Sequence, residues 1–340
     1  MAKPIFWNYF INPIVQVITI LIVTIALYLM SLFYLTQARI FDPAPGLQAV
    51  TNLDSKTKIR TGLFVSNFLN FDLIKNDFEL LGTVWFEFNK NDVDLAMLEQ
   101  AVFSKGELEP HLNLHEDPLP IVQEQDGLVF AQYPVRVNFA SNLNHKLFPF
   151  DSHRLYLSFN NMHLDSEKFA FVTKPDQFVL SDNATTFGWL AVEQQVHSGY
   201  ITKQLANDKT VSYPRVLYSI DFIRNSFKDV LLLLLPLLVT FFMSMFTFSY
   251  DHEVYRSSIL SVGVATVSAM VGYRFVINNA APKVPYFMLV DWLFVLFLLL
   301  GFTVFLINVF NLFKNYRGLI ILILHTILVS SWYTLLYIWG

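Results

Sequence analysis

The chain has 340 residues, of which 54% are hydrophobic and only 15% are charged, and its mean hydropathy is positive. This composition excludes an ordinary water-soluble protein of this size, so lipid is the expected solvent for much of the chain. The net charge of −4 is spread without charged blocks, which argues against nucleic acid as a partner. The absence of cysteine excludes disulfides, thiolate catalysis and cysteine-based zinc sites.

Five apolar runs are long enough to cross a bilayer core about 30 Å thick, which requires a helix of roughly 20 residues. We expect spans at residues 14–34, 230–250, 257–277, 286–310 and 318–339. The first run is predicted to be an uncleaved anchor, because signal-peptide cores are usually shorter. The alternative is a signal peptide cut after Ala38.

The stretch between the first and second spans holds most of the charge and is predicted to fold in water. It contains segments that mix β-branched and aromatic residues with alternating polar ones, as strands do. These segments are 61–69, 80–88, 128–139, 153–159, 169–173, 189–196 and 215–224. Turn residues separate them as in an antiparallel β-sandwich.

The sequence therefore predicts a membrane protein with three parts. Residues 1–38 form a transmembrane anchor, residues 39–226 an extracellular antiparallel β-sandwich, and residues 227–340 a four-helix transmembrane domain. The bias of positive residues towards the cytoplasmic side places Lys3, Arg256, Lys314 and Arg317 inside the cell. We thus expect a multi-pass protein of the cell (inner or plasma) membrane, with a cytoplasmic N-terminus and an extracellular or periplasmic β-domain.

The third span differs from its neighbours because it is built largely from small and polar residues. Steps of three or four residues along it bring one set of positions to a single helix face. That set is Ser261, Ala265, Ser268, Gly272, Phe275 and Asn279. Such a face either lines water in a pore or forms a close helix-packing seam.

Several residues, in the right order, resemble landmarks of the pentameric ligand-gated ion channels, the Cys-loop receptor superfamily. Phe148-Pro149-Phe150-Asp151 resembles the core of the signature loop, and Trp189 and Arg224 resemble conserved positions of the strands that follow. Pro236 resembles the proline of the first pore-domain helix. The run from Pro282 through Lys283 to Tyr286, with Asp291 beyond, is similar to the connection after the pore helix. The chain looks like the prokaryotic type that lacks the disulfide, with an extra N-terminal span.

The resemblance implies a homopentamer in which ions pass along the second pore-domain helix and ligand binds between subunits. Phe148 and Phe150 are expected to rest on the loop from Pro282 to Tyr286, and Asp151 to pair with Arg224. Movement of the β-domain would then reach the pore helix.

Several residues near the two ends of the third span each allow two interpretations. Phe275 is either a dewetting gate in the pore or a core aromatic, and Arg274 is expected in a structural ion pair or at the membrane interface. Asp251 and Glu253 against Arg256 favour cations weakly at the inner mouth, although a helix cap would explain them too.

Ligand candidates in the β-domain are aromatic residues and one histidine: Trp85, His163, Tyr200 and Tyr213. Aromatic faces suit cationic amines, yet a sandwich core needs aromatics as well. His111 and His115 lie in a proline-rich loop, and would serve a proton or divalent-cation sensor or simply be solvated. No metal site and no cofactor is expected. No nucleophile accompanies His163 and Asp165, so we expect no enzyme.

The leading hypothesis is a homopentameric ligand-gated ion channel in the lipid bilayer, opened by a small molecule, protons or divalent cations. The alternative is a non-conducting sensor or scaffold on the same fold that uses its first span to contact a partner. Two residues motivate this alternative: Ser268, at a position where the family mostly carries a bulky apolar residue, and Arg274.

Overall fold

The computed structural model describes residues 7–35, 42–49, 53, 56–104, 121–182, 184, 186, 188–204, 210–225 and 227–339. The chain divides into two compact units. A helical unit comprises Met1–Arg39, His145–Asp151 and Ser226–Gly340. A strand unit comprises Ile40–Asn144 and Ser152–Asn225.

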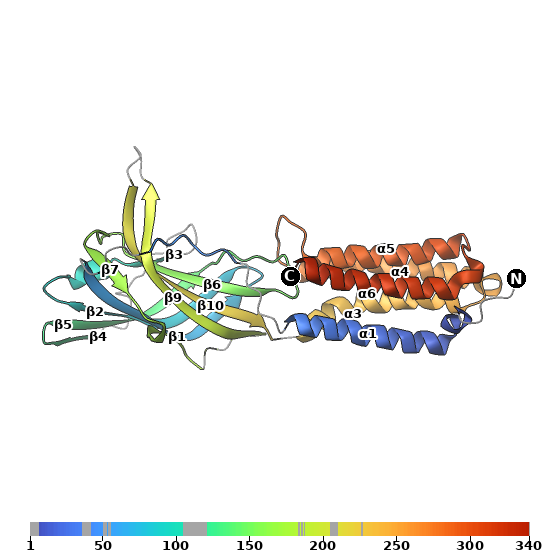
Figure 1. Cartoon of the computed structure of the whole chain (residues 1–340), viewed down its shortest axis with the longest axis horizontal. Coiled ribbons are helices and arrows are strands. Elements are labelled where there is room, and N and C mark those ends of the chain that lie inside the picture. The colour runs from blue at the N-terminus through green and yellow to red at the C-terminus, as the bar shows by residue number, and fades with distance from the viewer. Residues whose placement is uncertain are drawn as a thin grey trace. The chain divides into compact units, whose positions relative to one another are not determined.

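The helical unit contains five long helices that lie side by side in Figure 1. They are α1 (Pro13–Leu35), α3 (Phe227–Phe246), α4 (His252–Ala280), α5 (Leu289–Val309) and α6 (Arg317–Trp339), with short 3-10 turns η1 (Trp7–Ile11), η5 (Thr247–Ser249) and η6 (Lys314–Tyr316). By length and composition all five are apolar enough to cross a membrane. The five predicted apolar helices are therefore confirmed, and they indicate a membrane protein.

Helix α1 packs onto the rest of the helical unit through one stripe of its surface. The stripe consists of the buried residues Gln16, Val23, Leu27, Ser31 and Tyr34, which recur at helical spacing. It contacts α3 and α6, and the Tyr28 ring meets the Phe227 ring edge-on at 4.6 Å. Most other side chains of α1 are exposed, as expected for a helix that borders lipid.

The strand unit contains two sheets. One has the order β4-β5-β2-β1-β7, with β8 also paired to β1, and the other has the order β3-β6-β10-β9. The strands of the first sheet are β1 (Thr57–Asp72), β2 (Asp77–Asn89), β4 (Ile121–Gln125), β5 (Leu128–Phe139), β7 (Phe169–Val172) and β8 (Phe178–Leu180). Those of the second are β3 (Val102–Ser104), β6 (Ser152–Asn160), β9 (Trp189–Gln204) and β10 (Thr210–Arg224). A short helix α2 (Leu95–Leu98) and a turn η3 (Pro175–Gln177) complete the unit.

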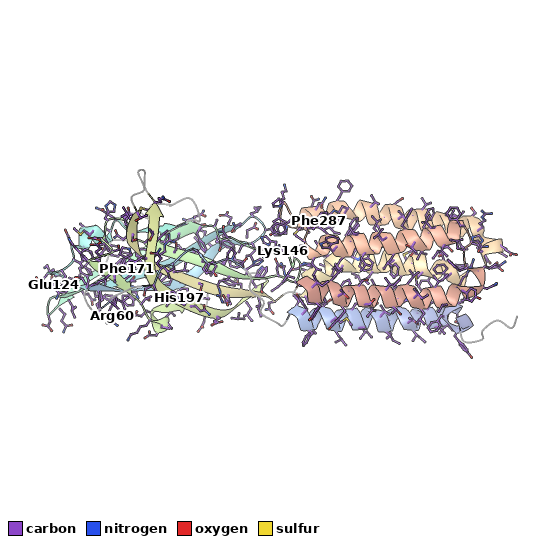
Figure 2. All side chains as sticks on the ribbon, turned by 45° about the horizontal axis from the view of Figure 1, so that its top comes forward. Arg60, Glu124, Lys146, Phe171, His197 and Phe287 are labelled. Atoms are coloured by element: carbon purple, nitrogen blue, oxygen red, sulfur yellow. The ribbon has the colours of Figure 1, made fainter. Side chains whose placement is uncertain are left out.

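One aromatic cluster joins the buried faces of the two sheets. Alternate residues of β2 are buried, as the strand period of two requires. Phe86 of β2 lies 5.6 Å from the ring of Phe159 on β6, and Phe159 lies 5.6 Å from Phe171 on β7. Figure 2 labels Phe171 within this unit. Burial of these rings supplies much of the hydrophobic stabilisation that a unit without disulfides needs.

The seven predicted strands are all present, but the expectation of purely antiparallel pairing is wrong at one edge. Strands β7 and β8 both run parallel to β1, pairing first with Thr57–Arg60 and then with Leu63–Val65. They behave as one edge strand interrupted by η3, where Pro175 cannot donate a ladder hydrogen bond.

Tyr133 gives the strand unit a predictable sensitivity to alkaline pH. Its ring is buried and its hydroxyl donates to Glu99 Oε1 at 3.1 Å. Burial, followed by the Glu99 carboxylate, raises the pKa of the Tyr133 phenol above its ordinary value. In the unfolded chain the phenol ionises near pH 10, so the stabilisation by neutral Tyr133 is complete below about pH 10 and is lost progressively above it.

We expect the free energy of unfolding of the full-length protein in detergent to fall by about 1 kcal/mol between about pH 8 and pH 11 through this residue. Urea titrations at the two pH values measure the fall, and Tyr133→Phe should reduce it. An identical fall in the variant would show that Tyr133 does not carry the effect.

Candidate functional site

Helix α4 presents two contrasting faces within the single chain. The five buried apolar or small residues Ile259, Gly263, Thr266, Met270 and Ile277 form one stripe. At about 100° per residue, the predicted pore face lies on the opposite side. All six of its members, Ser261, Ala265, Ser268, Gly272, Phe275 and Asn279, are exposed. The small-residue stripe is therefore not a packing seam against any other part of the chain that the structure describes.

The buried stripe of α4 packs closely against α5. A Cβ atom on Gly263 would lie only 2.7 Å from the Phe305 ring, and one on Gly301 would lie 2.9 Å from the Met270 sulfur. Gly272, on the exposed face, has no atom within 4 Å of the equivalent position. The two glycines of α4 thus serve different purposes, in agreement with the helical spacing that places Gly272 but not Gly263 on the predicted face.

This difference predicts opposite effects of the same substitution. Gly263→Ala should destabilise the helical unit by about 1 to 3 kcal/mol, because the half-buried Phe305 ring must move to make room for the added methyl group. Gly272→Ala should be neutral or stabilising by up to about 1 kcal/mol, since alanine favours the helix. Thermal unfolding of the two full-length variants in the same detergent measures both effects. Equal destabilisation would contradict the assignment of the faces.

Arg274 and Phe275 are neighbours with separate environments. Phe275, on the predicted face, is 72% exposed. Arg274 points towards α5, where its Nη1 donates to Asp291 Oδ1 at 2.5 Å and its guanidinium lies 5.3 Å from the Phe294 ring centre. Asp291 Oδ2 accepts from the Met288 amide at 2.8 Å, which caps α5. Arg274 is thus in an ion pair within the chain, one of the two environments expected for it.

The start of α4 carries the charged residues predicted at the inner mouth. Asp251 caps the helix by accepting from the Glu253 amide at 2.9 Å, so α4 begins earlier than the predicted span. The backbone is non-helical at Tyr255, just before the exposed Arg256. Glu253 forms an ion pair with Lys314 of η6. Lys314 therefore offsets part of the acidic excess on which the expected cation preference depends.

Residues 145–151, which contain the Phe148-Pro149-Phe150-Asp151 motif, belong to the helical unit, where they bind the start of α5. Leu289 donates its amide to the Lys146 carbonyl at 2.8 Å, and Val290 donates to the Phe148 carbonyl at 3.1 Å. The His145 amide donates to the Tyr286 hydroxyl at 3.0 Å. The loop thus contacts both the connection after α4 and the first turn of α5.

Apolar contacts reinforce this attachment. Phe148, Pro149 and Phe150 are buried, and Phe150 meets the ring of Tyr34 from α1 edge-on at 6.1 Å. In the connection itself, Pro282 is buried and Lys283 is exposed. Buried Asp151 lies 3.3 Å from His145 Nδ1.

The expected Asp151–Arg224 pair joins residues of the two separate units and stays a prediction. Within the strand unit, the Arg224 guanidinium lies 4.4 Å from the centre of the Trp189 ring. Trp189 and Arg224 are register partners on β9 and β10. The two landmarks of the resemblance are therefore in contact.

Two of the four ligand candidates, Tyr200 and Tyr213, lie on neighbouring strands of the four-stranded sheet, and His163 lies in the turn after β6. Tyr200 of β9 pairs with Pro214, next to the half-buried Tyr213 on β10. The Asn161 amide donates to the Pro214 carbonyl, and Asn161 Oδ1 accepts from the amide of exposed His163. Trp85 instead belongs to the six-stranded sheet, where its half-buried ring packs 5.6 Å from Phe130.

Tyr200 has a structural partner that sequence reasoning missed. Lys56 Nζ lies 4.5 Å from the centre of its ring and donates to its hydroxyl at 2.9 Å and to the Ser166 carbonyl at 2.7 Å. Tyr200 is buried, and its hydroxyl accepts from Lys56 and donates to the Phe169 carbonyl at 3.4 Å. No sequence signal joins two residues 144 positions apart. His111 and His115 lie outside the described residues.

Comparison of the chain with protein-family models and with curated proteins gives no match.

Proposed function

We propose that this chain is the subunit of a homopentameric ligand-gated ion channel of the prokaryotic type, with α4 lining the ion pathway. The exposed face of α4 carries the proposal. Ser261, Ser268 and Asn279 lie exposed in an apolar span, where uncompensated polar groups are costly in lipid. In a ring of several chains, this face would line a central water-filled pore.

The residues on either side of this exposed face also support a ring of chains. On either side of the polar stripe α4 exposes apolar residues, among them Val262, Val264, Val271 and Val276. These positions are turned by about 60° to 100° from the stripe, so they would meet neighbouring helices when the stripe meets water. A helix that faced only lipid would not require a polar stripe with apolar residues on both sides of it.

The strand unit is, in this proposal, the extracellular β-sandwich that receives the ligand. Its candidates lie in different places, with Trp85 on one sheet, Tyr200 and Tyr213 on the other, and His163 in the turn after β6. A pocket between neighbouring subunits would bring the outer regions of both sheets together. The signature loop would pass the ligand signal to α4 through Tyr286 and the start of α5.

Current measurement tests the proposal directly. Purified full-length protein is placed in planar bilayers while pH, calcium and a panel of small amines are varied, and native mass spectrometry counts the subunits. Stimulus-dependent single-channel steps from a pentamer are the expected result. A folded oligomer that stays silent across the panel would contradict channel function.

The second candidate is a non-conducting sensor or scaffold built on the same elements. Helix α1 favours it, because α1 packs on α3 and α6 and exposes most of its remaining surface. Under this proposal a partner protein covers that surface. A silent oligomer that retains a partner through α1 would support it.

A further inference from the structure

A cavity of about 750 Å³ lies where α4 ends and α5 begins, within the helical unit. The connection between the two helices forms much of its wall. Its polar and aromatic lining consists of Arg274, Asn278, Lys283, Tyr286, Phe287 and Asp291. Figure 2 labels Phe287 at this end of the unit.

The cavity carries more positive than negative charge. Both oxygens of buried Asp291 are engaged, one by Arg274 and the other by the Met288 amide. The Arg274 side chain is 34% exposed, and within the described part of the chain it hydrogen-bonds only through Nη1, so its other donors remain available to a ligand. Lys283 is exposed and has no partner among the residues that the structure describes. The cavity therefore offers two cations, Arg274 and Lys283, while the carboxylate of Asp291 is already hydrogen-bonded. This arrangement suits an anion.

The position of the cavity distinguishes among anions. The apolar spans of α4 and α5 stop at Ala280 and Leu289, which is the level at which lipid phosphates lie. The rings of Phe287 and Trp292 lie 5.4 Å apart and are 59% and 40% exposed. Exposed aromatic pairs at span ends are typical of the interface between membrane and water.

We infer that this cavity binds the phosphate group of a phospholipid. Arg274 and Lys283 donate to the phosphate oxygens, Asn278 supplies an amide, and Phe287 and Trp292 contact the glycerol and the upper acyl chains. Such a lipid would bridge the end of α4 and the start of α5, one residue away from Phe275. The inference requires insertion in a membrane but does not require conduction.

Native mass spectrometry of the full-length protein in detergent tests the inference, with palmitoyl-oleoyl phosphatidylglycerol as the titrated probe. We expect Lys283→Gln to weaken binding about tenfold, the usual effect of losing one charge-assisted hydrogen bond. Lys228→Gln is the matched control, since Lys228 is an exposed lysine in the first turn of α3 and does not line the cavity. Equal affinities for the wild type and Lys283→Gln would overturn the inference.

Two further comparisons separate the phosphate from the acyl chains and from a free anion. Diacylglycerol with the same chains should bind at least about tenfold more weakly than the phospholipid, and equal binding would overturn the role of the phosphate. Inorganic phosphate should fail to displace the lipid, whereas full displacement would identify a free-anion site instead.

Arg274→Gln combined with Asp291→Asn removes the cation without leaving an unpaired buried carboxylate, and should also weaken lipid binding.

Discussion

Replacing Phe275 with alanine is expected to open the proposed channel without a stimulus. Phe275 is 72% exposed at the position on α4 where a ring of aromatic side chains would close the pore by dewetting. Alanine widens the constriction and removes apolar surface, so water and ions would occupy it at rest. We expect the basal open probability in planar bilayers to rise about tenfold or more, which corresponds to about 1.4 kcal/mol or more.

Phe302→Ala is the matched control for this experiment. Phe302 is an exposed phenylalanine of α5, 44% accessible, so the same side-chain truncation is made on a different helix surface. It should leave the basal open probability close to that of the wild type. A rise in both variants would indicate a general loosening of the helical unit, and no rise in Phe275→Ala would remove the gate from this position.

The sequence is most informative where a single physical constraint acts on a continuous segment. Lipid requires about 20 apolar residues in one run, so all five long helices could be located from composition alone. The exposed face of α4 could also be predicted, because helical spacing places Ser261, Ser268 and Gly272 on one side whatever surrounds them. Its proposed function as a pore lining needs further copies of the chain and lies beyond that argument.

Contacts between distant segments could be predicted only in outline. The resemblance placed the signature loop on the connection after α4, but the backbone bonds of Leu289 and Val290 to this loop have no local pattern. The same holds for Lys56 and Tyr200. Strand β4 was missed because all five of its residues are exposed and therefore show no burial alternation.

The Arg274–Asp291 pair is expected to be the strongest single polar link between α4 and α5. Asp291 is buried, and Arg274→Leu would leave its carboxylate without the cation that compensates for its lost hydration. Breaking a buried pair costs about 3 to 5 kcal/mol, but Arg274 is 34% exposed and solvent screens part of the interaction. We therefore expect a loss of about 2 to 3 kcal/mol in stability, measured by thermal unfolding of the full-length protein in detergent.

Two comparisons decide whether this loss reflects the unpaired carboxylate. Lys314→Leu breaks the Glu253 pair, whose side chains are 55% and 71% exposed, and should change stability far less. Adding Asp291→Leu to Arg274→Leu removes the stranded charge and should recover most of the loss, because apolar replacements of buried pairs are often neutral. Recovery would show that replacing both partners with leucine lowers stability little, whereas removing Arg274 alone lowers it much more. A double variant as unstable as Arg274→Leu would instead show that losing the Asp291 cap on the Met288 amide costs about as much as leaving the carboxylate unpaired.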